Sequence, residues 1–269
     1  MQSARKAITK RYMRIRYRIR ELFEGSASRR VIFVHIPRCG GSTVNDYFKT
    51  RLGSGDSGRV ILLNDAERGT DWEARLAQAR SARFVGGHFG GETLDAIRGD
   101  AFVFTFIRSP LERLISTFVY SSAFRHPDRR LCANSFEEFL DAPTADVLQA
   151  ADNLQVRQLA VAVDYQDAMR VPRERWLELA IRRLSGFDHV GIVEDYDTHM
   201  RAILDKLRMD RPASIRAVNT SLQEMRRSGV SADLPDLTPA AIALAKPFVE
   251  LDQELYDMFR GGTAKAGLV

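Results

Sequence analysis

The feature that most constrains the fold of this chain is an apolar segment that ends in a glycine turn. Residues 31–34 read Val-Ile-Phe-Val, and the chain then runs through a short loop into Gly40–Thr43, which reads Gly-Gly-Ser-Thr. Such a run followed by glycines predicts a buried β-strand, a tight turn and the start of a helix. Glycines let the backbone approach an anion, and Ser42 and Thr43 can cap the helix. The segment therefore predicts a phosphate-binding turn, with Arg38 as a charged donor beside it.

Other interpretations of this turn stay open. It lacks the Gly-Lys-Ser/Thr ending of a Walker A loop, which disfavours a magnesium-nucleotide site but leaves a P-loop-type nucleotide kinase as an alternative function. A non-catalytic nucleotide-binding protein is a second alternative. An ordinary strand-to-helix turn with a capping serine would also contain glycines.

A second strand followed by basic residues favours the phosphate interpretation. Residues 102–107 read Phe-Val-Phe-Thr-Phe-Ile, and Arg108 follows directly, at the strand end where ligands gather in open parallel sheets. Pro110 suits the first turn of a helix, on which Arg113 and Ser116 lie three residues apart and near one face. An arginine at a strand end and a serine on the next helix can hold a second phosphate.

The two motifs resemble those of a known enzyme family. Ile36–Thr43 is similar to the 5′-phosphosulfate loop of the sulfotransferases that use 3′-phosphoadenosine 5′-phosphosulfate (PAPS), and Arg108–Ser116 is similar to their 3′-phosphate motif. The likeness is closest to the carbohydrate sulfotransferases, in particular the heparan sulfate 2-O-sulfotransferase type, and covers residues 31–260. It implies an α/β fold with a central parallel β-sheet flanked by helices, the P-loop-like sulfotransferase fold. It also implies transfer of a sulfuryl group from PAPS to a carbohydrate hydroxyl, with PAP as the product.

The same resemblance assigns residues to the nucleotide. From the two motifs these are Arg38, Cys39, Gly40, Gly41, Ser42, Thr43, Arg108 and Ser116; from a later segment, which is similar to the one that closes over the nucleotide, they are Arg216, Thr220 and Ser221. A polar loop before the last helices is the alternative for the later segment. No metal ion is expected, because no cluster of His, Cys, Asp or Glu has zinc spacing and the family's reaction needs none.

His88 is the best candidate for a catalytic base among the five histidines. It stands between the two motifs in Gly-Gly-His-Phe-Gly-Gly, where flanking glycines leave the ring open to a substrate, and the resembled family has its base in a similar Gly-His segment. A structural histidine at a strand end is the alternative. We also expect Glu92 to orient the His88 ring, and His35 to pack or hydrogen-bond beneath the site.

This sequence departs from the resembled family at two positions. The heparan-type enzymes have a second histidine two residues before the base, where this chain has Gly86. The family loop usually carries lysine where this chain has Arg38. An arginine can stabilise the bridging oxygen and the phosphate, but its pKa above about 12 excludes full proton donation. We therefore predict that Arg38 acts in catalysis by electrostatic stabilisation.

Charge is distributed unevenly along the chain. Residues 1–30 contain ten Lys/Arg and two Glu, whereas the remaining 239 residues contain 30 basic and 33 acidic side chains. The body is thus mildly acidic, which disfavours nucleic-acid binding. In the arm, apolar residues from Ile8 to Leu22 recur at helical spacing among basic residues. We therefore divide the chain into a basic amphipathic helix with a linker, residues 1–30, and one sulfotransferase domain, residues 31–269.

Three interpretations of the helix at residues 5–23 stay open. It docks on the body or on a sister subunit of a homo-oligomer, it lies on an anionic membrane surface, or it is a solvated extension. No apolar run approaches the about 20 residues of a membrane span, and the N-terminus has no signal-peptide core. Since the eukaryotic relatives are generally anchored Golgi enzymes, we expect a bacterial cytoplasmic enzyme, peripheral at the inner membrane face if the arm binds lipid.

The acceptor is expected to be a glycan or another carbohydrate. Arg125, Arg129 and Arg130 would suit an anionic sugar, although arginines after a helix are usually solvated. Cys39 and Cys132 are expected to be reduced thiols.

Strands and helices alternate along the rest of the chain, which predicts a parallel sheet covered on both faces. The expected further strands are 60–63, 83–87, 102–107 and 189–193, and the expected helices are 72–79, 111–124, 135–141, 145–159, 173–184, 196–208 and 239–258.

Overall fold

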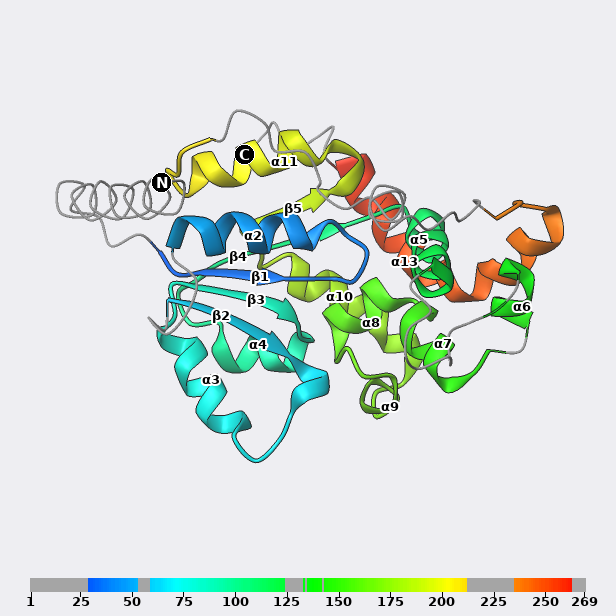
Figure 1. Ribbon diagram of the computed structural model, residues 1–269, viewed down its shortest axis with the longest axis horizontal. Helices are drawn as coiled ribbons and strands as arrows, with labels where there is room; N and C mark the ends of the chain where they lie inside the picture. The colour runs from blue at the N-terminus through cyan, green and yellow to red at the C-terminus, as the bar shows by residue number, and fades with distance from the viewer. Residues whose placement is uncertain are drawn as a thin grey trace, which may run out of the picture.

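Five parallel strands form the sheet at the centre of the protein, in the order β2-β3-β1-β4-β5 (Figure 1). They are β1 Val31–Val34, β2 Val60–Asn64, β3 Phe84–His88, β4 Phe102–Ile107 and β5 His189–Ile192. The computed structural model describes residues 29–52, 59–123, 133, 135–141, 143–211 and 235–262. The predicted central parallel sheet flanked by helices is confirmed.

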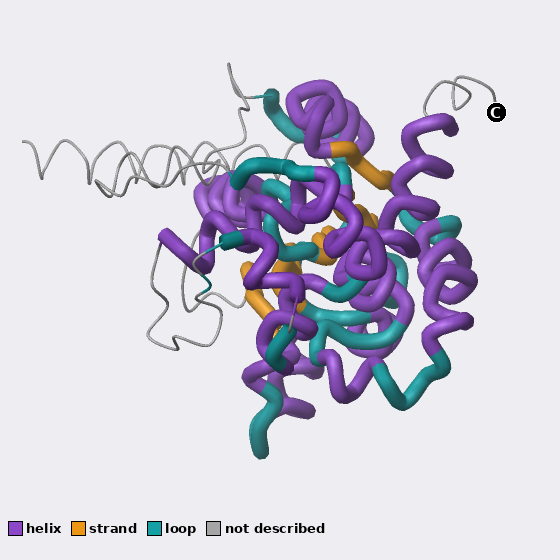
Figure 2. Tube along the Cα trace, turned by 90° about the vertical axis from the view of Figure 1, so that its right-hand side faces the viewer, coloured by secondary structure: helices purple, strands orange, loops and turns teal. Residues whose placement is uncertain are grey.

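Helices cover both faces of this sheet, so that the strands lie enclosed between them (Figures 1 and 2). They are α2 Gly41–Leu52, α3 Trp72–Ser81, α4 Gly91–Ile97, α5 Pro110–Ala123, α6 Phe136–Asp141, α7 Ala145–Ala151, α8 Leu154–Ala160, α9 Tyr165–Ala168, α10 Trp176–Leu184, α11 Tyr196–Lys206 and α13 Pro239–Gly262, with short 3-10 turns η1 Asp65–Glu67, η3 Arg173–Arg175 and η4 Val193–Asp195. Helices α2 and α11 lie on one face, and α3, α4 and α10 on the other.

The strand order creates a crevice between the loops that follow β1 and β4. After β1 the chain turns toward β2 on one side of the sheet, whereas after β4 it leads to β5 on the other side. Connections that leave in opposite directions open a space at the carboxyl ends of these two strands, which is where open α/β sheets bind ligands. Every residue of β1 and β4 is buried, as expected for the centre of a parallel sheet. The fold therefore brings the two predicted phosphate motifs to one crevice.

The predicted single helix 145–159 is wrong. The chain leaves the helix at Asp152, and Asn153 adopts a left-handed conformation with φ 41° before α8 begins. Asparagine enters this region at lower cost than most residues. Apolar periodicity runs through both helices, so that it conceals the break. The short helices α4 and α9 were also not predicted.

The side chain of Asn153 is inserted into the hydrogen-bond ladder of α13. Its Oδ1 accepts from the backbone N–H of Leu251 at 2.8 Å and of Asp252 at 3.1 Å, and its Nδ2 donates to the Pro247 carbonyl at 2.9 Å. The Pro247 carbonyl and the Leu251 N–H are four residues apart and would pair with each other in a regular helix. The Asn153 amide is inserted between these two groups and pairs with both of them instead.

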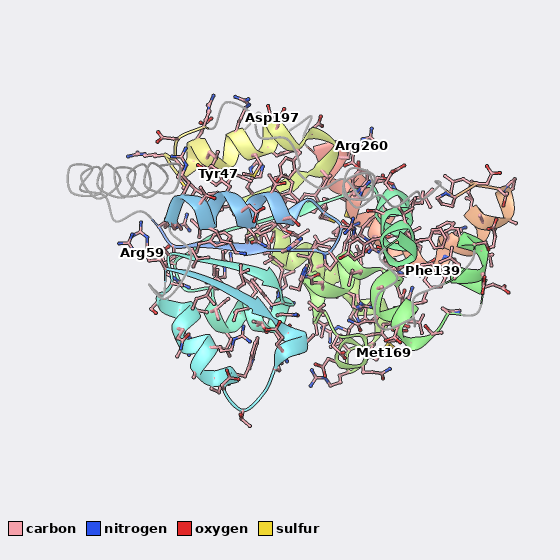
Figure 3. The ribbon with its side chains drawn as sticks, viewed as in Figure 1. Tyr47, Arg59, Phe139, Met169, Asp197 and Arg260 are labelled. Carbon is pink, nitrogen blue, oxygen red and sulfur yellow. The ribbon has the colours of Figure 1, made fainter. Side chains whose placement is uncertain are left out.

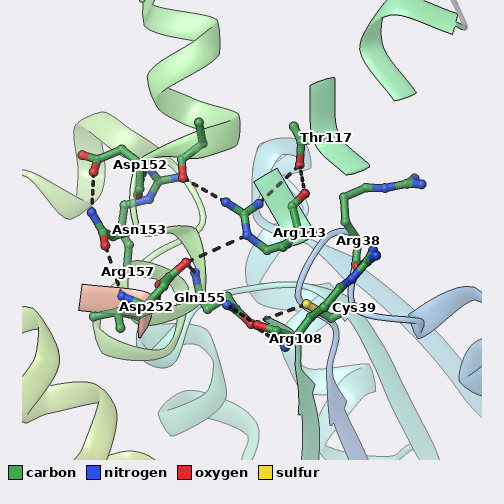
Figure 4. Close-up of polar contacts among 12 residues, drawn as sticks. Arg38, Cys39, Arg108, Arg113, Thr117, Asp152, Asn153, Gln155, Arg157 and Asp252 are labelled. Carbon is green, nitrogen blue, oxygen red and sulfur yellow. Dashed lines mark hydrogen bonds and ion pairs between the residues drawn. The ribbon is translucent and has the colours of Figure 1, made fainter. Parts of the chain in front are cut away.

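Asp252 of α13 caps α8 in return (Figure 4). Its carboxylate accepts from the backbone N–H of Val156 at 2.8 Å and of Gln155 at 3.3 Å. These amides belong to the first turn of α8, where a helix has no acceptors of its own. Burial raises the pKa of Asp252, although Arg113 and the two amides act in the opposite direction. The two helices thus satisfy each other's exposed backbone groups.

A second, smaller hydrophobic cluster holds α13 against α5 and α6. It includes Phe118 of α5, Phe139 of α6 and Phe248 of α13, with Phe118 and Phe139 in edge-to-face contact at 5.6 Å (Figure 3). Such aromatic contacts add to the burial of apolar area. This cluster fixes the part of α13 that precedes Asp252.

Within the described residues, no helix is both long and apolar enough to cross a bilayer. The predicted arm helix at residues 5–23 lies outside the described residues. Arg29 and Arg30 at the end of the arm are described, and Arg30 donates to the carbonyls of Ala82, Ala79 and Ile97.

We expect Asn153→Ala to lower the free energy of unfolding by at least about 2 kcal/mol. The change leaves buried groups of α13 without partners and puts alanine in the left-handed region. Urea unfolding measures the effect. Asn153→Gly removes the amide but tolerates the backbone, so it should be less destabilising than alanine; an equal or larger loss would contradict the backbone part of this account. Glu254→Ala, at an exposed position of the same helix, is the control and should change stability by less than about 0.5 kcal/mol.

Candidate functional site

The loop after β1 has a conformation that favours glycine at two places. Gly40 has φ 75°, and a Cβ there would lie 2.9 Å from the Tyr196 ring; a Cβ on Gly41 would lie 1.9 Å from the His35 ring. Arg38 also has a positive φ, 66°, which turns the loop sharply before α2. The loop is thus shaped by close packing against two aromatic rings.

The first turn of α2 faces the crevice with backbone N–H groups that have no acceptor within the helix. Ser42 is exposed at this turn, whereas Thr43 is buried. The Tyr196 hydroxyl donates to the Gly40 carbonyl at 3.1 Å. Cys39 is fully buried, and burial raises the pKa of its thiol to about 12. Of these loop residues, Cys39 therefore offers its backbone alone to a ligand.

Arg38, Arg108 and Ser116 meet on one side of this loop, and Figure 4 shows the two arginines beside Cys39. Arg38 Nε donates to Ser116 Oγ at 3.2 Å, and Arg108 Nη1 donates to the Arg38 carbonyl at 3.3 Å. The Arg38 guanidinium also lies 4.3 Å from the centre of the Tyr120 ring. The structure therefore brings the cationic residues of both predicted phosphate motifs together, next to the N-terminus of α2.

Arg113 is separated from this group, although it lies near Ser116 on α5. It is fully buried; its Nη2 donates to the Ala151 carbonyl at 2.9 Å, and its Nε lies 3.9 Å from Asp252. Burial lowers the pKa of Arg113, and the Asp252 charge opposes this. Arg113 thus stabilises the α5–α7–α13 packing.

Gln155 of α8 joins the two motif loops, and the sequence analysis missed it. Its Nε2 donates to the Arg108 carbonyl at 2.9 Å, and its Oε1 accepts from the Arg108 N–H at 2.8 Å. The Cys39 thiol lies 3.6 Å from the same oxygen. A signal was present in the sequence, because Gln155 and Gln158 are uncharged polar residues within an otherwise apolar helix face.

The ring of His88 is oriented by a backbone carbonyl. His88 Nδ1 lies 3.0 Å from the His35 carbonyl oxygen, and because a carbonyl can only accept, Nδ1 carries the proton and Nε2 has the free lone pair. Burial lowers the pKa of His88 below 6.5, and the bond to His35 opposes this in part. At neutral pH His88 is therefore an unprotonated imidazole that can take a proton at Nε2.

Gln158 of α8 binds two backbone carbonyls that lie next to His88. Its Nε2 donates to the His35 carbonyl and to the Phe89 carbonyl, each at 3.0 Å. The first carbonyl orients the His88 ring, and the second belongs to the residue that follows His88. Gln158 therefore positions His88 from beneath, a role that the sequence analysis missed.

The prediction that Glu92 orients His88 is wrong. Glu92 forms an ion pair with Arg170 at 3.5 Å, on the surface. The turn after His88 is held by Asp65 instead, whose carboxylate accepts from the Gly90 N–H at 2.9 Å and from the Thr93 hydroxyl at 2.8 Å.

His35 packs beneath the site, as expected. It is buried, and its ring centre lies 4.2 Å from that of His88 and 5.4 Å from that of Phe33. Burial, followed by the His88 and Arg38 charges, lowers the pKa of His35 well below its usual value. A second histidine therefore does lie beside His88, but it comes from the β1 loop and not from the Gly86 position.

Several predicted residues lie outside the described residues: Arg125, Arg129, Arg130, Cys132, Arg216, Thr220 and Ser221. Their assignments stay predictions. In the part of the chain that the structure describes, no three His, Cys, Asp or Glu side chains are grouped so that they could hold a metal ion.

The arrangement combines two chemical properties. Arg38, Arg108 and the helix N-terminus form a cationic crevice suited to phosphate groups, and His88 at the end of β3 supplies a neutral base.

We expect His88 to titrate below pH 6.5 and to carry its neutral-state proton on Nδ1. Two-dimensional ¹⁵N NMR of histidine-labelled protein measures both properties, with His88→Ala to assign the signal. Since the folded pKa is depressed, the contribution of His88 to stability is full above pH 6.5 and is lost as the pH falls through the folded pKa. A pKa at or above 6.5, or the Nε2-protonated tautomer, would contradict the proposed orientation.

Comparison with known proteins gives one finding. A family model described as "Sulfotransferase family" matches residues 26–259, which includes both motif loops, His88 and all five strands. No curated protein matches the sequence.

Proposed function

Since the chain belongs to the sulfotransferase family, we propose that it transfers a sulfuryl group from PAPS to a hydroxyl of a carbohydrate acceptor, with His88 as the general base. The observation that supports this best is the meeting of both phosphate motifs beside a neutral histidine whose Nε2 is free to accept a proton.

PAPS has phosphate groups at two separate positions, and the crevice offers two sets of donors for them. In this proposal the α2 N-terminus and Ser42 bind the 5′-phosphosulfate end, and Arg108 with Ser116 binds the 3′-phosphate. Charged donors and helix amides hold phosphates strongly because they satisfy several oxygens without a large reorganisation. Arg216, Thr220 and Ser221 are proposed to complete the nucleotide site.

The transfer itself needs a base, an in-line approach and stabilisation of the leaving phosphate. His88 Nε2 takes the proton from the acceptor hydroxyl while the hydroxyl oxygen bonds to sulfur. The bond from sulfur to the bridging phosphate oxygen breaks, and its electron pair leaves with PAP. Arg38 stabilises the negative charge on that oxygen without donating a proton.

The assignment to the heparan sulfate 2-O-sulfotransferase type belongs to this proposal, with one modification. The second histidine of that type is absent at Gly86, whereas His35 lies against His88 from the neighbouring strand. We propose that His35 supports the His88 ring from that position.

Calorimetric titration with PAP, compared with ATP and magnesium, tests the nucleotide assignment. We expect micromolar PAP binding and much weaker binding of ATP with magnesium. Binding of ATP with magnesium, together with indifference to PAP, would overturn the proposal and favour the P-loop kinase alternative.

We expect His88→Ala to lower kcat for sulfuryl transfer by about 10²–10⁴-fold with the affinity for PAP retained, because the base contacts the acceptor proton and not the nucleotide. Sulfate transfer is followed with radiolabelled PAPS. His199→Ala is the matched control, since His199 pairs with His189 at 3.0 Å at the opposite end of the sheet. Full turnover in His88→Ala would remove His88 as the general base, whereas PAP binding without any turnover in the unchanged protein would favour a non-catalytic nucleotide binder.

We expect Arg108→Ala to weaken PAP binding by about 10–100-fold, the usual contribution of a hydrogen bond to a charged group. Calorimetry measures the affinity. Arg201→Ala is the control, because Arg201 pairs with Asp197 four residues before it on the surface of α11, much as Arg108 pairs with Glu112. Equal PAP affinity in both variants would remove Arg108 from the nucleotide site.

A further inference from the structure

A groove of about 420 Å³ runs from His88 along β2, on the face of the sheet that carries α2. One wall is a single face of α2, formed by Ser42, Asn45, Asp46 and Lys49, which are spaced three, four and seven residues from the first and so line up along the helix. This volume lies within the range of small-ligand sites. The groove is thus a built cleft that leads to the candidate base.

The groove is deep because the middle residue of β3, Gly86, has no side chain. Leu62 of β2 lies in register with Gly86, and Asn64 with His88, so these residues share a face of the sheet. A Cβ on Gly86 would lie 2.4 Å from Asn45 Oδ1. Leu62 is a large apolar residue that is 37% exposed. An apolar strip beside polar side chains is therefore open along the path to His88.

The polar groups of the groove suit hydroxyls. Serine and asparagine side chains can each donate and accept hydrogen bonds, and the groove contains Ser42, Asn45 and Asn64. Asn45 Oδ1 is buried and has no hydrogen-bond partner among the described residues. The hydroxyls of a ligand could hydrogen-bond to the amides of the groove, and an apolar ring face of the same ligand could pack against Leu62.

The charge of the groove gives no net attraction to a polyanion. Among its described lining residues, Asp46 and Glu67 supply two carboxylates and Lys49 supplies one ammonium. Arg75 binds Glu67 Oε2 at 3.1 Å and the Leu62 carbonyl at 3.1 Å, so the charge of Glu67 is paired and Lys49 is left to balance Asp46. A chain of uronic acids would therefore find no excess positive charge here to offset the desolvation of its carboxylates, a cost that an uncharged chain does not have.

We propose that this groove binds an uncharged saccharide chain and directs its target hydroxyl to His88. The inference rests on the sulfotransferase function proposed above and names its acceptor class. It differs from the anionic glycan expected from the arginines after α5, which lie outside the described residues.

Two acceptor panels test the charge preference. Cello- and chito-oligosaccharides represent uncharged chains, and heparosan and unsulfated chondroitin represent uronic-acid chains. We expect kcat/KM for sulfation to be at least about tenfold higher for the uncharged panel, about 1.4 kcal/mol. A higher kcat/KM for the uronic-acid panel, or sulfation of neither panel by protein that binds PAP, overturns the proposal.

Leu62→Trp tests the location of the acceptor. A tryptophan at Leu62 fills the open strip, so we expect the acceptor KM to rise at least about tenfold while the PAP affinity stays that of the unchanged protein. Asp46→Trp fills the groove from α2 and should act in the same way, which protects the test if one variant folds poorly. Leu237→Trp is the control, because Leu237 is a leucine of similar exposure, 41%, outside the groove.

The outcomes separate the two proposals. Failure of the unchanged protein to bind PAP would contradict the sulfotransferase proposal itself. Retained PAP binding, with an acceptor KM that changes no more in Leu62→Trp and Asp46→Trp than in Leu237→Trp, would contradict the acceptor groove alone.

Discussion

The reciprocal capping of α8 and α13 is the interaction on which the candidate site depends. Asn153 satisfies backbone groups of α13 in the turn that follows Pro247, and Asp252 satisfies the first turn of α8. This exchange holds α8 at a fixed position beneath the sheet edge. Gln155 and Gln158 project from that helix to the Arg108 segment and to the His88 segment. Because buried amides cost free energy when unpaired, each bond of this network supports the next.

The site keeps a cationic region and a neutral base close together. Arg38 and Arg108 meet at the β1–β4 crevice, whereas His88 lies one strand further, at the end of β3. Burial keeps the pKa of His88 and of His35 below the usual value, so that neither ring adds a positive charge at neutral pH. A base must be unprotonated to accept a proton. Because His88 is buried one strand away from the two arginines, it can stay neutral while the arginines keep the charge that phosphate binding needs.

Much of the site was predictable from short-range patterns. We could predict that the residues after Val34 and after Ile107 lie near each other. Both follow apolar strands, and parallel strands bring their carboxyl ends to one edge of the sheet. The helix break at Asn153 was not predictable, since the side chain of Asn153 pairs with backbone groups of α13 nearly a hundred residues later in the chain. Glu92 was assigned wrongly to His88, because proximity in sequence does not reveal that a backbone carbonyl already occupies Nδ1.

The amino-acid sequence by itself determined the alternation of strands and helices, the glycine turn before α2 and the identity of the charged residues at the two strand ends. These follow from local sterics, periodicity and side-chain chemistry. Only the tertiary structure decided which polar side chains are buried and paired, for example that Arg113 lies against Asp252 and that Gln158 supports His88. It also decided that the apolar side chain of Leu62 stays partly exposed beside Gly86. Such pairings depend on packing between segments distant in the chain, where burial removes water and leaves each polar group dependent on its protein partner.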